Sequence, residues 1–169
     1  AGPEDLAARL VAAHGGRSAW QAASTVSYDH TLEFDGDEGR HWRSIEVIER
    51  STGHAYHEYP NHGSRLAWNG REVWASDWSI GNPPKVMIKL TQYSVIAPFL
   101  SLVPGARLEA APPAKVPGQE QLLPTFIVRF LKDSSKPPSA VYYRLYLDPL
   151  TSRLGALEYA VGYGRLLDL

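Results

Sequence analysis

The chain contains no cysteine among its 169 residues, and this absence removes several kinds of chemistry at once. Disulfide bridges, thiol nucleophiles and thiolate metal ligands are all excluded. A chain of this length buries roughly two-thirds of the surface that its unfolded form exposes, so it needs no disulfide or metal to fold. We therefore expect residues 1–169 to form a single domain.

Excess charge and long apolar runs are also missing. The net charge is −1 and no basic run is present, which argues against nucleic acid or an anionic membrane surface as a partner. The most apolar stretch, 88–103, carries Lys89 and Pro98 and is too interrupted for a membrane span. The chain starts at Ala1 and its only methionine is Met87, as expected of a mature chain after signal removal or of a trimmed one.

Motifs of catalytic sites are absent too. The sequence has no Gly-x-Ser-x-Gly and no Ser-x-x-Lys in a helical context, so it offers no activated serine. Asp35, Asp37 and Glu38 share one turn and are explained as turn formers. Glu33 and Glu46 fall near the first hairpin, where we expect them to face solvent. No carboxylate pair is therefore expected to face one cleft, and we predict no catalytic residue and no enzyme.

The six histidines are the remaining candidates for metal chemistry. His54 and His57 stand three apart in an expected strand, so they point to opposite faces. His57, Glu58 and His62 could converge across the following turn, which keeps a hydrolase or metal enzyme as a third hypothesis. We predict no metal site and no cofactor, with these histidines in solvent or at the edge of the core.

Aromatic residues are plentiful, with five Trp and nine Tyr, types that favour strands and half-wet pocket walls. Arg40, Trp42 and Arg43 suggest a stacking platform for single-stranded nucleic acid. The nearly neutral chain argues against that function, so no nucleic acid partner is predicted.

Short amphipathic strands dominate the chain after an N-terminal helix that Gly15 and Gly16 end. Asn69-Gly70 between apolar flanks predicts a tight hairpin. Alternating residues predict an antiparallel meander over 25–34, 40–50, 54–59 and 65–76, and further strands over 125–131, 141–148 and 154–161. Residues 110–124 hold four prolines and are expected to form an irregular loop.

A markedly apolar helix, expected over 85–103, interrupts the strands, and Pro98 should kink or divide it. A helix that is apolar on two sides packs either in an ordinary core or against a captured apolar ligand. Alternation selects the residues that would line such a pocket: Val26, Tyr28, Leu32, Phe34, Ile45, Val47, Val73, Met87, Leu90, Phe99, Phe126 and Val128.

The order of these elements resembles a known family, the LolA/LolB-like superfamily of bacterial outer-membrane lipoprotein-sorting proteins. The resemblance is carried by the order of weak motifs along most of the chain: His14-Gly15-Gly16 with Trp20, the Trp68-Asn69-Gly70-x-x-Val73-Trp74 hairpin, the apolar helical insertion, and Tyr146-Leu147-Asp148-Pro149-x-Thr151.

This resemblance implies a strongly curved antiparallel sheet that forms an incomplete barrel, with an N-terminal helix and an inserted apolar lid helix. It implies non-enzymatic binding or transport of a hydrophobic ligand (an acyl chain, lipid or lipoprotein) by a monomer that is periplasmic or membrane-anchored on the cell envelope. The alternative is a structural or protein-interaction module of the envelope with a filled core and no ligand.

Overall fold

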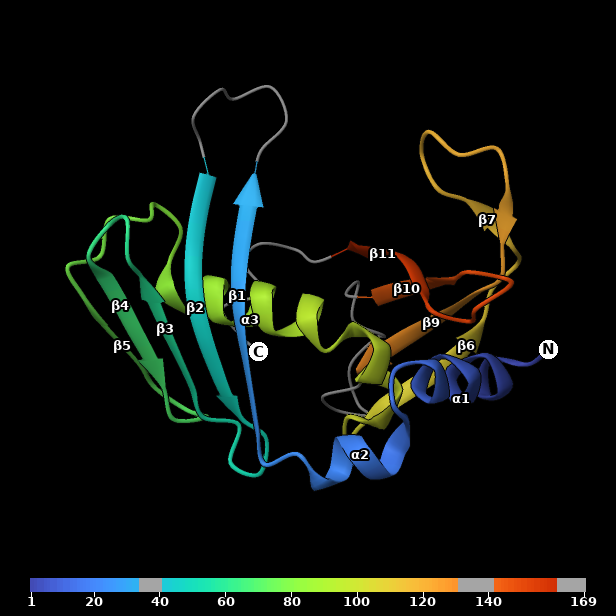
Figure 1. Ribbon diagram of the computed structural model, residues 1–169, viewed down its shortest axis with the longest axis horizontal. Coiled ribbons are helices and arrows are strands. Elements are labelled where there is room, and N and C mark those ends of the chain that lie inside the picture. Colours follow the sequence, from blue (N-terminus) through green and yellow to red (C-terminus); the bar gives the residue numbers. More distant parts are fainter. Residues whose placement is uncertain (34–40, 131–141, 161–169) are drawn as a thin grey trace, which may run out of the picture. The chain divides into compact units, whose positions relative to one another are not determined.

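The computed structural model describes residues 1–33, 41–130 and 142–160, and the chain divides into two compact units (Figure 1). The five-stranded unit is Ala22–Gln92, and the four-stranded unit combines Ala1–Gln21 with Tyr93–Leu169. Both main sheets are antiparallel and a few helices accompany them, so the predicted mainly β fold is confirmed. The single-domain organisation stays a prediction.

The five-stranded sheet is a simple meander in which each strand pairs with the next along the chain. Its strands are β1 (Thr25–Glu33), β2 (His41–Glu49), β3 (Ala55–Tyr59), β4 (Ser64–Trp68) and β5 (Val73–Ser76). The alternation of apolar and polar residues had predicted this meander, and the structure confirms it. Phe34 and the expected turn over 35–39 lie outside the described residues.

The inner face of this sheet packs against the helix α3 (Pro84–Val95). Leu66 from β4 meets Met87 and Ile88 from α3, and all three side chains are almost fully buried. Strand β2 alternates strictly, so its odd-numbered residues lie on the opposite, outer face. Burial of one residue set per strand fixes the register of the whole sheet.

The turn between β4 and β5 shows why Asn-Gly is a strong hairpin signal. The side-chain oxygen of Asn69 accepts hydrogen bonds from the backbone N–H groups of Arg71 (2.9 Å) and Glu72 (2.7 Å). Gly70 has a φ of 88°, a conformation that residues with a Cβ atom avoid. The two residues therefore satisfy and shape the turn without help from the core.

The apolar helix predicted over 85–103 is divided, as expected from Pro98. The α-helix α3 ends at Val95, and a 3₁₀ helix, η1 (Ala97–Leu102), follows it. Pro98 lies in the first turn of η1, where its missing N–H would have no intrahelical acceptor.

The four-stranded unit packs α1 (Pro3–Ala13) and η1 on a sheet of order β11-β10-β9-β6. Its core contains Leu10 of α1, Leu100 of η1, and Phe126 and Leu145 of the sheet. The remaining elements of the unit are α2 (Gly16–Ala22), β6 (Ala106–Ala110), β7 (Ala114–Lys115), β8 (Leu122–Leu123), β9 (Thr125–Phe130), β10 (Tyr142–Leu147) and β11 (Leu154–Ala160).

Strand β6 had no counterpart in the sequence-based expectation, and the region expected to be irregular contains the small β7–β8 ladder. The segment 111–113 has no regular structure, and Thr125 donates a hydrogen bond to the carbonyl of Pro112 there (2.8 Å). The expected connection over 132–139 and the last residues, 163–169, lie outside the described residues.

Replacing Gly70 with alanine should destabilise the protein by about 1–2 kcal/mol, because a Cβ atom is strained at this φ. The measurement is the free energy of unfolding from urea titration followed by circular dichroism. Gly2→Ala is the matched control, since Gly2 has a φ of −75° and should change stability by less than about 0.5 kcal/mol. Equal effects of the two changes would contradict this account of the turn.

Candidate functional site

A carboxylate buried on the inner face, in β2, is the most unusual feature of the five-stranded unit. Glu46 is 0% exposed, so the expectation that it faces solvent is wrong. Its strand β2 places Trp42, Ser44 and Ile48 on the same face, and all of them are buried. A charged side chain in such a position requires hydrogen-bonding partners.

Two hydroxyl groups satisfy the carboxylate. The Tyr28 hydroxyl donates to Oε2 of Glu46 at 2.6 Å, and the Ser44 hydroxyl donates to Oε1 at 2.5 Å. Tyr28 lies directly opposite Glu46 in the β1–β2 register, and Ser44 is the next residue on the same face of β2. The pairing of the strands therefore assembles this part of the site.

Two imidazoles approach the same carboxylate. His57, opposite Glu46 in β3, is fully buried, and its Nε2 lies 3.3 Å from Glu46 Oε2. These atoms are close but not aligned for a hydrogen bond, and Nε2 has no hydrogen-bond partner in the part of the chain that the structure describes. Nδ1 of His57 lies 3.3 Å from the Tyr59 hydroxyl, and Nδ1 of His30 lies 3.7 Å from Glu46 Oε1.

Burial determines the protonation of this cluster. It lowers the pKa of His57 to about 4, against the opposing effect of the Glu46 charge, so His57 is neutral at pH 7. Burial also raises the pKa of Tyr28 and of Tyr59, and the Glu46 charge raises both further. The tyrosines therefore keep their protons, and Glu46 is held by neutral donors.

Helix α3 closes over the cluster through Thr91, which is 1% exposed. The Thr91 hydroxyl donates to the carbonyl of Met87 at 3.0 Å and lies within hydrogen-bonding reach of the Tyr28 hydroxyl. Tyr28 thus contacts both the buried carboxylate and the helix. We call Tyr28, Ser44, Glu46, His57 and Thr91 the buried polar cluster.

The chemistry open to the buried polar cluster is limited. The Ser44 hydroxyl is bonded to a carboxylate rather than to an imidazole, so it is not arranged as a nucleophile. No group of three or more His, Cys, Asp or Glu that could hold a metal ion occurs within residues 1–33, 41–130 and 142–160. His54 and His62 are exposed while His57 is buried, so the hypothesised histidine site is not assembled.

The residues expected to line a pocket fall into different environments. Val26, Tyr28, Leu32 and Val73 lie on the inner face of the five-stranded sheet and are half-buried. Placing Ile45 and Val47 with them was wrong, because the β1–β2 register puts these two on the outer face, where Ile45 is 41% exposed.

The other predicted residues belong to helix α3 or to the four-stranded unit. Met87 is buried and Leu90 half-buried on α3. Phe126 and Val128 are buried in the core of the four-stranded unit. Phe99 stacks on Trp20 in that unit, with ring centroids 4.2 Å apart.

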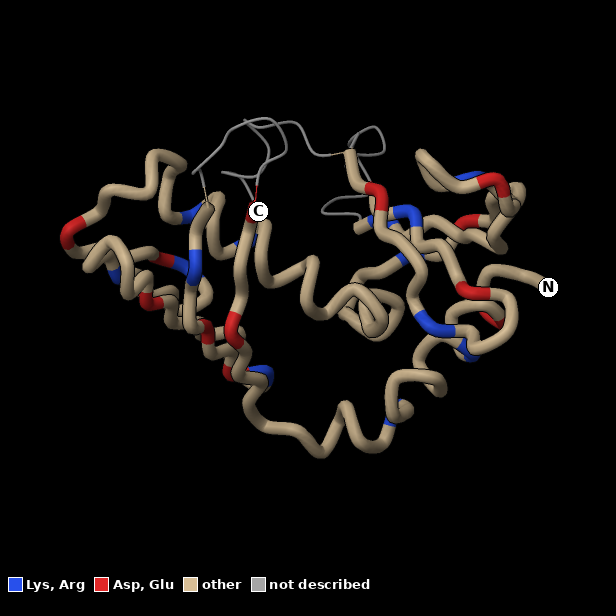
Figure 2. Tube along the Cα trace, turned by 45° about the horizontal axis from the view of Figure 1, so that its top comes forward, with Lys and Arg blue, Asp and Glu red and all other residues tan. Residues whose placement is uncertain are grey.

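The suggested nucleic acid platform does not form. Trp42 is buried on the inner face, whereas Arg43 lies on the outer face and donates to Asp29 with 3.1 Å from Nε to Oδ1. Arg40 lies outside the described residues. Lys and Arg residues are interspersed with Asp and Glu along the chain (Figure 2).

A groove of about 350 Å³ in the four-stranded unit is a separate candidate. Its lining includes Ala7 and Val11 of α1, Leu102 of η1 and Leu108 of β6. This volume lies near the lower limit of small-ligand sites, and the charged or hydroxyl side chains in the lining are Glu4, Arg17 and Ser101.

Sequence reasoning missed the buried polar cluster although a signal was present. Glu46 alternates in phase with Trp42 and Ile48, which indicates an inward-facing carboxylate. His57 carries the same two-residue phase between Ala55 and Tyr59. Charged residues are almost never fully buried unless paired, and their partners here come from neighbouring strands.

No family model matches the chain, and neither the curated proteins nor the solved structures contain a match. The resemblance to LolA/LolB-like proteins therefore stays a prediction. Within the described residues, every helix is too short or too polar to cross a membrane.

Replacing Glu46 with alanine should destabilise the protein by about 2–4 kcal/mol, because the buried Ser44 hydroxyl and the hydroxyl of the half-buried Tyr28 lose their acceptor. Urea unfolding measures the change. Glu49→Ala, on the exposed face of the same strand, is the control and should cost less than about 1 kcal/mol. A similar small loss for both variants would show that the carboxylate is not needed for stability.

Protonation of His57 should by itself lower the free energy of unfolding by about 3 kcal/mol as the pH drops from 6.5 to 4. The unfolded chain binds a proton near pH 6.5, whereas the folded chain binds it only near pH 4. The contribution of His57 to the free energy of unfolding is therefore at its full value above pH 6.5 and is lost progressively as the pH falls from 6.5 to 4.

Urea titrations at half-unit pH steps measure this slope. His57→Gln should remove most of it, whereas His62→Gln, at an exposed position, should leave it unchanged. An identical slope in the wild type and in His57→Gln would disprove the assignment.

Proposed function

We propose that the protein binds or transports a hydrophobic ligand with an acyl chain in the bacterial cell envelope, without catalysis. The observation that supports this proposal most is the partial exposure of the inward-facing side chains of β1. Its inward side chains Val26, Tyr28 and Leu32 lie on the face that α3 covers elsewhere, yet all three remain half-buried. Half-buried apolar side chains beside a packed helix offer a wall for an apolar ligand.

Binding would come mainly from burial of the acyl chain. Each CH₂ group removed from water contributes about 0.8 kcal/mol, so a chain of ordinary length binds tightly with few polar contacts. Helix α3 acts as the lid in this proposal, and its displacement from the inner face admits the ligand. Thr91 and Tyr28 connect the lid to the sheet, so opening must separate them as well as the buried Met87 and Ile88 from the inner face.

The finer parts of the proposal follow the LolA/LolB resemblance. The antiparallel sheets would curve strongly into an incomplete barrel around the ligand. The protein would work as a monomer in the periplasm, free or anchored on the membrane. Its partners would be a lipid or lipoprotein and an envelope protein that delivers or accepts the cargo.

A filled core is the second candidate, and the packing beneath α3 favours it. Leu66, Met87 and Ile88 are at most 2% exposed, so this part of the inner face is already occupied by side chains. In that case the protein is a structural or interaction module of the envelope and carries no ligand.

Organic extraction of the purified protein, followed by lipid mass spectrometry, separates the two candidates. Co-purified lipid or fatty acid at a stoichiometric amount, absent from a mock purification, is the expected result. A clean extract, together with no uptake of a fluorescent fatty acid, would overturn ligand binding and favour the filled core.

Leu32→Lys should weaken binding of a fluorescent fatty acid by at least about tenfold, because a charge would enter the proposed apolar wall. Fluorescence titration measures the affinity. Thr31→Lys is the matched control, since Thr31 is the neighbouring residue on the outer face and is exposed. Equal affinities of the two variants would place the ligand elsewhere, provided that circular dichroism shows both to be folded.

A further inference from the structure

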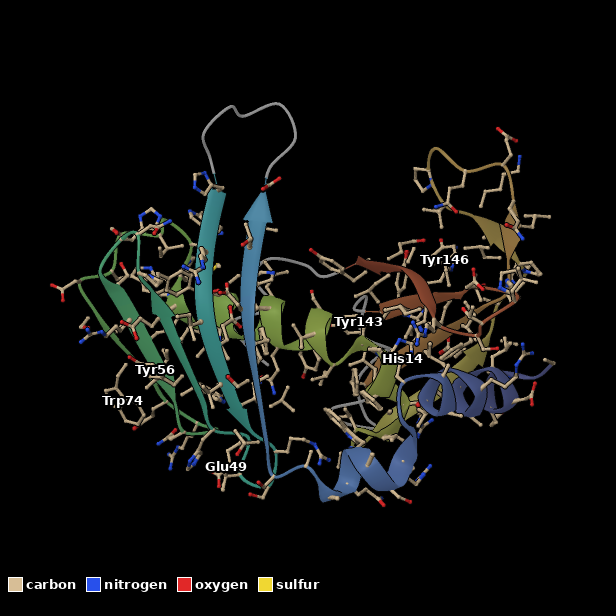
Figure 3. All side chains as sticks on the ribbon, in the orientation of Figure 1. His14, Glu49, Tyr56, Trp74, Tyr143 and Tyr146 are labelled. Carbon is tan, nitrogen blue, oxygen red and sulfur yellow. The ribbon has the colours of Figure 1, made fainter. Side chains whose placement is uncertain are left out.

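The outer face of the five-stranded sheet exposes two large aromatic side chains in one row. Tyr56 of β3 is 40% exposed and Trp74 of β5 is 53% exposed. Ala67 of β4 pairs with both of them, so the three residues cross the sheet side by side on one face. Both aromatic side chains appear on this part of the sheet in Figure 3. We call Tyr56, Ala67 and Trp74 the aromatic row.

The geometry of the aromatic row leaves the rings accessible. Tyr56 and Trp74 stand two strands apart, which corresponds to about 9.5 Å. The small side chain of Ala67 leaves the surface between them open. Neither the Tyr56 hydroxyl nor the Trp74 indole N–H has a hydrogen-bond partner within the described ranges. Each ring therefore offers an apolar face and an unused polar tip.

Polar side chains flank the aromatic row on both sides. Toward one side, Arg65 Nη2 lies 3.7 Å from Glu58 Oε1. Toward the other side, Glu49 accepts a hydrogen bond from the Thr52 hydroxyl (2.7 Å) and lies 3.6 Å from His54 Nδ1. One pair of opposite charges, Arg65 with Glu58, and the hydrogen-bonding groups of Glu49, Thr52 and His54 thus lie beside the row.

The apolar area of this face is small for a protein partner. The exposed large hydrophobic residues among those described in this unit are Ile45, Tyr56 and Trp74. A stable protein interface buries about 800 Å² on each partner around several apolar anchors. A narrow ligand that stacks on two separate rings fits the row better than a broad protein surface does.

We propose that the aromatic row binds an oligosaccharide, specifically an extended, β-linked chain of uncharged pyranose sugars. The apolar C–H face of a sugar ring stacks on Trp74, and the ring two units along the chain stacks on Tyr56, because the row spans about one disaccharide repeat. The sugar hydroxyls bond to the indole N–H, the tyrosine hydroxyl and the flanking Glu49, Glu58 and Arg65. This site lies on the opposite face from the proposed ligand wall and does not depend on it.

Isothermal titration calorimetry with chitohexaose and cellohexaose tests the proposal. At least one of these β-linked hexasaccharides should bind, and the curved, α-linked maltohexaose should bind at least about tenfold more weakly. Trp74→Ala and Tyr56→Ala should each weaken binding by about tenfold or more, as expected for aromatic anchors. Tyr159→Ala is the matched control, because Tyr159 is a 47% exposed tyrosine on the other sheet.

Ala67→Lys provides a second variant that keeps both rings but fills the space between them, and it should also weaken binding. Circular dichroism verifies the fold of every variant. Absence of binding to both β-linked sugars at millimolar concentration would overturn the proposal. Binding that survives Trp74→Ala and Ala67→Lys would overturn it as well. Loss of self-association or of lipid-vesicle binding in Trp74→Ala, without any sugar binding by the wild type, would assign the row to another partner.

Discussion

The buried carboxylate of Glu46 constrains the five-stranded unit more than any other group does. Its desolvation is compensated by the Tyr28 and Ser44 hydroxyls. The pairing of β1 with β2 positions Tyr28, whereas Ser44 lies on β2 itself, two residues from Glu46. A slip of β2 by one residue would turn Glu46 and Ser44 outward together and leave the Tyr28 hydroxyl without its carboxylate acceptor. The polar cluster thus favours the same register that burial of the apolar residues already specifies.

Local signals explain why much of the fold was predictable. Strand alternation, the Asn69-Gly70 turn and the break at Pro98 depend on a few neighbouring residues, and the structure contains all of them. The burial of Glu46 depends on residues that are distant along the chain and meet only through strand pairing. An unpaired charge is expected in solvent, so reasoning on β2 alone sent Glu46 to the wrong environment.

The placement of Ile45 and Val47 failed for a related reason. Alternation divides a strand into two sets of residues but does not say which set meets the helix. Tyr28 pairs with Glu46, so the apolar residues of β1 share a face with Trp42 and Ile48 rather than with Ile45. The sheet consequently has two faces of different chemistry: an apolar inner face with one polar cluster, and a polar outer face with exposed aromatic rings.

Helix α3 belongs to both units of the chain, and this affects how the protein unfolds. Its earlier turns supply Met87 and Ile88 to the core of the five-stranded unit, and its last turn supplies Tyr93, which packs on Phe130 and Tyr143 in the other core. Helical hydrogen bonds form cooperatively, so order at one end of a helix favours order at the other. One continuous stretch of backbone therefore couples the folding equilibria of two separate cores, and loosening of either core makes the other less stable.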